Sequence, residues 1–175
     1  SQVVMILGKP TVPFKDNENL CLQLLSCYLG TGMSSKLFVE LRERYGVAYD
    51  VGSHHPSREG ASPFILHAST TKEKAIKTLD VLRECWKDLL ENPLSKEDLS
   101  LAKTKYRSQI AHTSQTVAQI AERKAYLLGL QLPADFDQKN LKRLELLNSN
   151  DLQVTANKHL HQPLLSLCGP KKTIE

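Results

Sequence analysis

The stretch that decides the fold runs from Gly30 to Val51 and is written GTGMSSKLFVELRERYGVAYDV. It opens with a glycine-rich turn, continues as a short amphipathic helix, stops at Gly46 and resumes as a strand. Ser34 and Ser35 can cap the helix, because a serine hydroxyl accepts a backbone N–H of the first turn. Gly46 suits the left-handed conformation that often follows a helix. The stretch therefore predicts a helix, a tight bend and a strand in immediate succession.

Arg42 and Tyr49 lie on either side of this bend, seven positions apart. Glu40 is spaced to pair with Arg44 at i,i+4, whereas no carboxylate on the helix is placed to neutralise Arg42. Arg42 also lies in the last turn, where a cation complements the helix dipole. We therefore expect its guanidinium to be free to bind an acceptor from outside the helix.

Tyr49 has two interpretations on local evidence. It shares a strand face with Val47 and Val51, which favours a core tyrosine whose hydroxyl lies at the rim. Alternatively, it forms a site together with Arg42. The pattern of residues alone leaves both interpretations open.

The regions outside this stretch contain apolar runs and helical repeats that alternate along the chain. The sequence TTKE at Thr70–Glu73 is typical of a capping box, and Ser95 with Asp98 can cap the following helix. Apolar spacing and turn residues predict the remaining elements. We expect strands at 3–7, 48–54, 62–69 and 163–168, and helices at 17–29, 70–91, 95–111, 115–128, 136–147 and 151–160.

The predicted order is strand, two helices, a hairpin, several helices and a final strand. A hairpin next to long helical runs favours an α+β fold, with a mostly antiparallel sheet and several helices packed on one face. The 175 residues contain no internal repeat and no flexible linker, so we expect one domain at 1–175. The chain begins at Ser1 without an initiator methionine, which indicates a processed product or a piece of a longer protein.

Composition excludes several classes of protein. Hydrophobic residues make up 41% of the chain, which is typical of a globular protein, and no apolar run is long enough to predict a membrane span. The net charge of +4 is spread without a basic block, so we expect no nucleic-acid binding. The four cysteines form no C-x-x-C pair, which favours small apolar core thiols and is compatible with a reducing compartment.

No catalytic motif stands out elsewhere in the chain. Neither H-E-x-x-H nor H-x-x-E-H occurs among the six histidines, so we expect no metal to be bound by this chain. No G-x-S-x-G is present, and no cysteine has a recognisable histidine partner. The turn at Gly30 and Gly32 lacks the lysine and the strand context of a phosphate-binding loop.

The decisive stretch resembles the motif that opens the carboxy-terminal half of insulinase/pitrilysin-type zinc metallopeptidases. That motif has glycines, M-S-S, a basic residue and L-F, then an arginine and a tyrosine separated by six residues around a glycine. The similarity continues in looser form through V-V-M-I-L-G-K-P, A-S-T-T-K-E-K, L-S-K-E-D-L-S-L-A-K and S-L-C-G-P. This chain departs from the motif at Lys36, where arginine is frequent, and at Thr31, which is less usual.

The resemblance implies a domain equivalent to the carboxy-terminal inactive half of such a peptidase, predicted inactive as an isolated chain. The zinc would lie in a partner half that carries H-x-x-E-H, supplied in cis or in trans. By position, Arg42 and Tyr49 would bind the backbone of a peptide or unfolded polypeptide and stabilise the oxyanion. Gly30 and Gly32 would form the chamber turn.

A second reading of the same resemblance is a structural or scaffolding domain that holds a partner without sharing in catalysis. The presence of both Arg42 and Tyr49 argues against it, because a scaffold has no need of a paired cation and phenol.

Overall fold

The computed structural model describes residues 2–170 of the chain and has an α+β architecture. Four strands form one antiparallel sheet in the order β2-β3-β1-β4. The strands are β1 (Gln2–Pro10), β2 (Asp50–His54), β3 (Pro63–Thr71) and β4 (Leu164–Cys168). The helices are α1 (Asn19–Gly30), α2 (Lys36–Phe38), η1 (Val39–Arg44), η2 (Lys72–Lys74), α3 (Ala75–Glu91), α4 (Lys96–His112), α5 (Val117–Gly129), α6 (Phe136–Leu146) and α7 (Ser149–His159).

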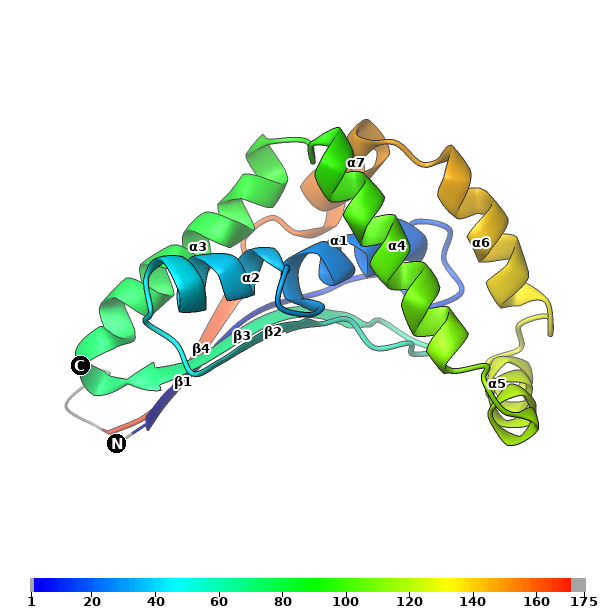
Figure 1. The fold of residues 1–175 in the computed structure, drawn as a ribbon, viewed down its shortest axis with the longest axis horizontal. Coiled ribbons are helices and arrows are strands. Elements are labelled where there is room, and N and C mark those ends of the chain that lie inside the picture. Colours follow the sequence, from blue (N-terminus) through cyan, green and yellow to red (C-terminus); the bar gives the residue numbers. More distant parts are fainter. Residues whose placement is uncertain (1, 171–175) are drawn as a thin grey trace.

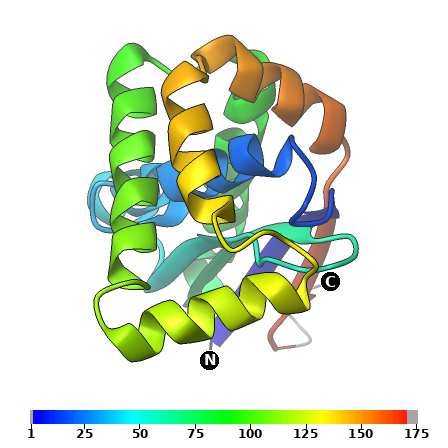
Figure 2. The same cartoon turned by 90° about the vertical axis from the view of Figure 1, so that its right-hand side faces the viewer.

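The helices cover one face of the sheet and leave the other face bare, as the sequence predicts (Figure 1). Helices α1 to α3 lie directly on the sheet, and α4, α6 and α7 lie farther out. The sheet is arched so that its uncovered face is concave. Helix α5 lies beyond one end of the arch; it is seen end-on in Figure 1 and lengthwise in Figure 2.

The core lies between the sheet and the first helix layer. Side chains at alternate positions of β1 and β3 point into it, as a sheet with one covered face requires. Helix α1 is buried along most of its length because it passes between the sheet and α4. The largest fully buried side chains include Phe64, Met5, Leu22, Leu24, Leu25, Leu29, Leu37, Leu41 and Leu82.

Two local expectations are wrong. Thr70 does not cap a helix, because β3 continues through Thr71 and the buried Thr70 hydroxyl donates to the Val47 carbonyl instead. Cys168 is exposed on the edge strand β4, whereas the other three cysteines are buried as expected. Among residues 2–170, none of the helices combines the length and the apolar composition that crossing a membrane requires.

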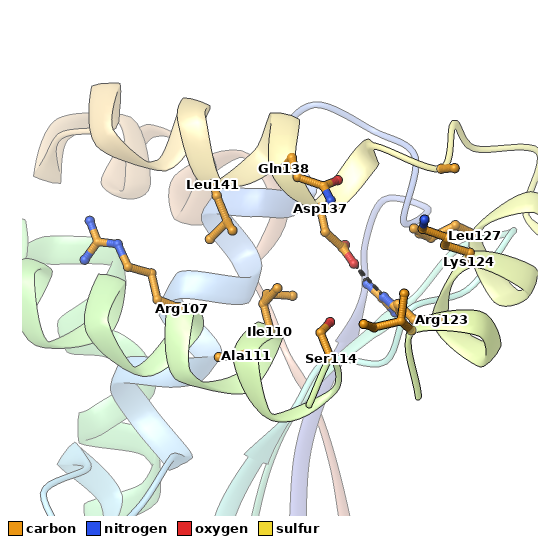
Figure 3. A pocket seen from close by; sticks show the side chains of 12 residues that line it. Arg107, Ile110, Ala111, Ser114, Arg123, Lys124, Leu127, Asp137, Gln138 and Leu141 are labelled. Atoms are coloured by element: carbon orange, nitrogen blue, oxygen red, sulfur yellow. Dashed lines mark hydrogen bonds and ion pairs between the residues drawn. The ribbon is translucent and has the colours of Figure 1, made fainter. Parts of the chain in front are cut away.

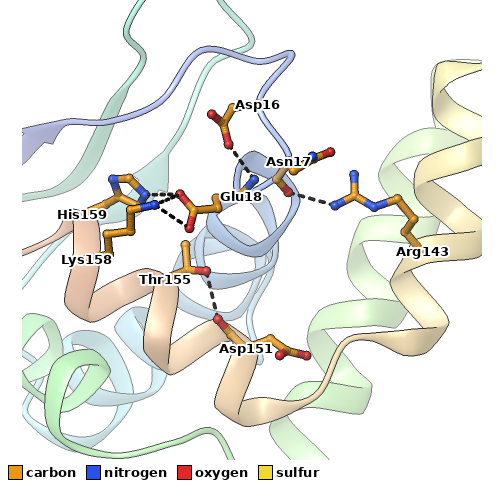
Figure 4. A network of polar contacts seen from close by, with 8 residues as sticks. All are labelled: Asp16, Asn17, Glu18, Arg143, Asp151, Thr155, Lys158 and His159. Atoms are coloured by element: carbon orange, nitrogen blue, oxygen red, sulfur yellow. Dashed lines mark hydrogen bonds and ion pairs between the residues drawn. The ribbon is translucent and has the colours of Figure 1, made fainter.

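An ionic cluster ties the start of α1 to the end of α7 (Figure 4). The Glu18 carboxylate accepts from Lys158 Nζ at 2.8 Å and lies 2.7 Å from His159 Nε2. Hydrogen bonds from Lys158 and His159 lower the pKa of Glu18 below its ordinary value. The cluster fixes α7 against the end of the core helix although the two segments are far apart in the sequence.

The buried histidine of the β2–β3 connection makes the stability of the fold sensitive to acid. His55 Nδ1 lies 3.2 Å from the Pro63 carbonyl, which can only accept, and Nε2 lies 2.9 Å from the Asn19 side-chain amide. Burial lowers the pKa of His55 to about 4, against an ordinary value of 6.5. The ring is therefore neutral in the folded protein at pH 7.

We expect the free energy of unfolding to fall as the pH drops from 6.5 to 4. Over this window the unfolded chain binds a proton at His55 and the folded chain does not, so acid favours unfolding, by about 2–3 kcal/mol in total. Chemical denaturation at pH 7 and pH 4 measures the difference. His55→Gln is the control, because its own loss of stability between the two pH values should be smaller by that amount. Equal pH dependence in both proteins would contradict the assignment.

Candidate functional site

The candidate site is built on the bend that joins η1 to β2. The Tyr45 N–H donates to the Glu40 carbonyl at 3.1 Å, a spacing of five residues that marks η1 as a π-helical turn. Such turns occur frequently at functional sites. Gly46 then adopts a left-handed conformation with φ of +58°, as the sequence predicts.

The chain after Gly46 folds back on the helix it has just left. The Leu41 carbonyl accepts from the N–H groups of Val47 at 2.8 Å and Ala48 at 3.3 Å. Leu41 is fully buried, so the bend is fastened to the core. The two candidate residues follow directly on either side of this anchor: Arg42 comes after Leu41, and Tyr49 comes after Ala48.

Side chains from β3, η2 and α3 hold the outside of the bend. The Val47 carbonyl accepts from the Thr70 hydroxyl and, at 3.2 Å, from the Thr78 hydroxyl. Lys74 Nζ donates to the Gly46 carbonyl at 2.8 Å. Both threonines are buried. The bend is thus fixed by several hydrogen bonds, and the backbone at both candidate residues is held in place.

Arg42 is exposed at the end of η1. Its guanidinium carbon lies 4.8 Å from the centre of the Phe38 ring, a cation–π distance. The neighbouring Arg44 is bound to Glu40 at 3.1 Å, as the spacing predicts. Among residues 2–170, the Arg42 side chain forms no ion pair and no hydrogen bond, so its donors face solvent.

Tyr49 is also exposed, with 64% of its surface accessible. Its backbone N–H donates to the Ser69 carbonyl at 2.8 Å and so continues the pairing of β2 with β3. Val47 is buried, whereas Tyr49 is not, so the core-tyrosine interpretation is wrong. The side-chain role of Tyr49 remains a prediction.

The two glycines of the turn differ in their surroundings. Gly30 is the last residue of α1 and lies against β2, where a Cβ atom would be 2.2 Å from the Ser53 backbone nitrogen. Gly32 has φ of +77° and no atom within 4 Å of a Cβ position. Gly30 therefore allows a close approach of helix and strand, and Gly32 allows the reversal of the chain between α1 and α2.

Residues 2–170 contain no group of three or more histidine, cysteine, aspartate or glutamate side chains that could hold a metal ion. The described part of the chain thus offers the exposed cation and phenol of the bend, but no donor set for zinc.

A cavity of about 340 Å³ lies elsewhere, between α4, α5 and α6 (Figure 3). Arg123 and Asp137 form a two-bonded ion pair at its wall, with both N–O distances at 2.8 Å. Hydrogen bonding to Asp137 raises the pKa of Arg123 above its ordinary value. The sequence did not predict this pair, because fourteen positions separate the two residues and no helical spacing relates them.

Residues 1–106 of the chain match the model of the protein family described as "Peptidase M16 inactive domain". An uncharacterized zinc protease of Rickettsia felis is 31% identical over 161 residues, which cover 90% of this chain and 38% of that protein. An uncharacterized zinc protease of Streptomyces coelicolor is 27% identical over 98% of this chain and 38% of that protein. The chain thus spans less than two fifths of these relatives.

Solved structures share the fold. The peptidase M16 inactive domain from Pseudomonas fluorescens superimposes with a TM-score of 0.87 at 22% identity, over 98% of this chain and 42% of that one. The inactive peptidase domain of a zinc protease from Bordetella parapertussis gives a TM-score of 0.83 at 15% identity, over 98% and 94% of the two chains. At these identities the likeness concerns the fold alone.

Proposed function

Since the chain belongs to the family of peptidase M16 inactive domains, we propose that it is the substrate-binding half of a zinc peptidase and that Arg42 and Tyr49 bind the substrate. The observation that carries the proposal is the bend itself. It is fixed by buried hydrogen bonds, yet it presents to solvent an exposed phenol and a guanidinium that has no ion pair within residues 2–170. Preorganised donors of this kind suit a charge that develops during a reaction.

The chemistry follows from the two side chains. A guanidinium keeps its charge at any physiological pH, and its planar donors can bind a peptide carbonyl oxygen. A phenol donates one further hydrogen bond. When a nucleophile attacks the scissile carbonyl, negative charge develops on that oxygen, and donors already in position stabilise it more than they stabilise the substrate.

The partner half would hold the zinc ion, which acts as a Lewis acid and lowers the pKa of a bound water. This chain would close over the other side of the peptide. In that arrangement it supplies binding and charge stabilisation and excludes water from the chamber. Its substrate is a peptide or an unfolded polypeptide, because only an accessible backbone can reach donors on both halves.

Reconstitution tests the proposal. The chain and a zinc-bearing half with H-x-x-E-H are assayed separately and together against a quenched fluorescent peptide. We expect cleavage only in the mixture, and we expect a chelator to abolish it. If the mixture is as inactive as the separate halves, although the halves bind each other, the proposal is wrong. If the mixture is active and substitution of Arg42 and Tyr49 leaves that activity unchanged, the result would instead support a scaffolding role.

A further inference from the structure

The cavity between α4, α5 and α6 has no part in the proposed function (Figure 3). It lies at the end of the arch that carries α5, whereas the bend between η1 and β2 lies toward the other end. Its volume of about 340 Å³ is in the range of pockets that bind small molecules. At the roughly 30 Å³ that a water molecule occupies in the liquid, this space holds a molecule of about ten non-hydrogen atoms.

Most of the cavity wall is apolar. Ile110 from α4, Ile120 and Leu127 from α5 and Leu141 from α6 all line it. In Figure 3, Ile110 and Leu141 lie between Arg107 at one end of the cavity and the α5 side chains at the other. A ligand that fills this middle part needs an apolar body, because a polar group buried there without a partner costs free energy.

The charged side chains of the wall are three cations and one carboxylate, namely Arg107, Arg123, Lys124 and Asp137. Both carboxylate oxygens of Asp137 already accept from Arg123, at 2.8 Å each. Arg107 Nη2 binds Glu145, which does not line the cavity. Lys124 forms no ion pair and no hydrogen bond among residues 2–170. The excess positive charge of the wall is therefore at the end formed by α5, where it favours a negatively charged group of a ligand.

Arg123 is held in place and keeps donors in reserve. A guanidinium has five N–H donors, and Asp137 accepts only two of them. Within residues 2–170, Arg123 Nη1 donates no hydrogen bond. The guanidinium carbon lies 5.7 Å from the centre of the Phe14 ring and 5.6 Å from that of the Tyr126 ring, and the side chain is 20% exposed. A largely buried cation is most stable when its remaining donors are also satisfied, so an anionic acceptor from a ligand would stabilise it.

We propose that this cavity binds a small molecule with an apolar body of about eight carbon atoms and one carboxylate group. The apolar body lies between Ile110 and Leu141, and the carboxylate accepts from Lys124 and from the remaining donors of Arg123. A cationic ligand would meet like charge at this end of the cavity, and a phosphate ester without an apolar body would leave the middle empty. Two sources carry the required chemistry: a free fatty acid and the carboxy-terminal residue of a peptide.

The ligand would attach α5 more firmly to the domain. Of the thirteen residues of α5 only Leu127 is buried, where it packs with Phe14 and Leu132 in a small cluster separate from the main core. A molecule in the cavity contacts α4, α5 and α6 together. Amide hydrogen exchange in α5 should therefore slow when the ligand binds, because weakly attached segments open most readily.

Three ligands of equal chain length test the proposal on the wild-type chain. Octanoate, octan-1-ol and octylamine differ only in the polar group, and octanoate has the size that the cavity holds. We expect calorimetry to give octanoate a Kd at or below about 1 mM, and we expect octanoate to raise the melting temperature. Octan-1-ol should bind about tenfold more weakly, because it lacks the charge-assisted hydrogen bonds, and octylamine more weakly still.

Paired variants locate the binding site. Lys124→Gln should weaken octanoate binding about tenfold and leave octan-1-ol binding unchanged. Lys142→Gln is the matched control, because Lys142 is an exposed lysine of α6 that does not line the cavity. Leu141→Trp fills the cavity and should abolish binding of both ligands. Leu146→Trp places the same side chain at an 82% exposed position of the same helix and should have no effect. Lys124 is exposed, so its variant folds even if Leu141→Trp does not.

Each outcome supports or overturns the site. Absence of octanoate binding overturns it, as does unchanged hydrogen exchange in α5 when octanoate is bound, because the ligand then lies elsewhere. Equal affinity for octanoate and octan-1-ol, or for octanoate in the wild type and Lys124→Gln, overturns the carboxylate contact. N-acetyl-leucine distinguishes the sources: if it binds more tightly than octanoate, the natural ligand is the end of a peptide, and otherwise it is a fatty acid. None of these results depends on Arg42 or Tyr49, so the proposed function is tested separately.

Discussion

Arg42→Ala is expected to lower the kcat of the reconstituted peptidase about 10²–10³-fold, the loss that follows removal of one preorganised donor from an oxyanion site. Tyr49→Phe removes a single hydroxyl and should cause a smaller loss in the same direction. Neither change should affect folding, because both side chains are exposed and neither holds the bend. The measurement is steady-state cleavage of a peptide with the zinc-bearing half at saturating concentration.

The same helix provides a matched control. Arg44 lies two residues beyond Arg42 and is also exposed, but its guanidinium is bound to Glu40 at 3.1 Å. Arg44→Ala should therefore leave kcat nearly unchanged and change the melting temperature very little, as the loss of an exposed i,i+4 pair does. Tyr45→Phe serves in the same way for Tyr49. Equal losses at positions 42 and 44 would show that charge on this surface matters in general and that Arg42 has no special role.

The double variant Arg42→Ala with Tyr49→Phe tests whether the two residues act on the same atom. If both donors stabilise one oxyanion, their effects should not add, because residues that act as a unit are non-additive. Fully additive losses would indicate separate contacts along the substrate backbone. That result would keep both residues in the binding site but would contradict a shared oxyanion.

The sequence predicted the bend because each part of it is set locally. The apolar spacing of residues 35–41, the serine cap and Gly46 all act within a few residues of one another. The Ser35 hydroxyl does accept from the Phe38 N–H, and Gly46 is left-handed. The antiparallel sheet with helices on one face was predictable for a similar reason, since the order of elements and the alternation of β1 and β3 allow few other folds.

The exposure of Tyr49 could not be predicted from strand periodicity. Side chains alternate between the two faces of a strand, and this period of two would have buried Tyr49 beside Val47. The strand, however, begins only at Asp50. Residues 47 and 48 are instead drawn toward the Leu41 carbonyl, and this contact depends on how η1 packs. The failed capping box has the same cause, because the tertiary contact from Thr70 to the Val47 carbonyl competes with a local cap.

Helix α5 shows a different limit of prediction from apolar periodicity. Its helical spacing predicted the element, and the bounds differ by only two residues at the start and one at the end. Periodicity identifies apolar faces but does not say which of them is covered within the domain. Leu127 is buried against Phe14, more than a hundred residues away in the sequence, whereas Val117 and Leu128 face solvent. Only the three-dimensional arrangement separates the inner from the outer face.

Gly30→Ala is expected to cost about 3 kcal/mol or more of stability, at the upper end of the range for overpacked sites. The added Cβ would lie 2.2 Å from the Ser53 backbone nitrogen and 2.7 Å from its Cβ, so a backbone must move. The hydrogen bond of 2.9 Å between the Ser26 and Ser53 hydroxyls would be strained by the same movement. For a chain of this length the melting temperature should fall by about 6–12 °C.

Gly32→Ala separates this steric effect from the conformational effect of losing a glycine. Position 32 has φ of +77° and open space around it, so alanine there meets no atom and pays only for the left-handed backbone, about 1–2 kcal/mol. Thermal and chemical unfolding should show that Gly30→Ala is much less stable than Gly32→Ala. If the order is reversed, α1 does not rest on β2 as closely as described. Because α2 and η1 follow α1 through this turn, a displaced α1 should also move Arg42. Gly30→Ala should therefore lower restored activity even at temperatures where the variant remains folded.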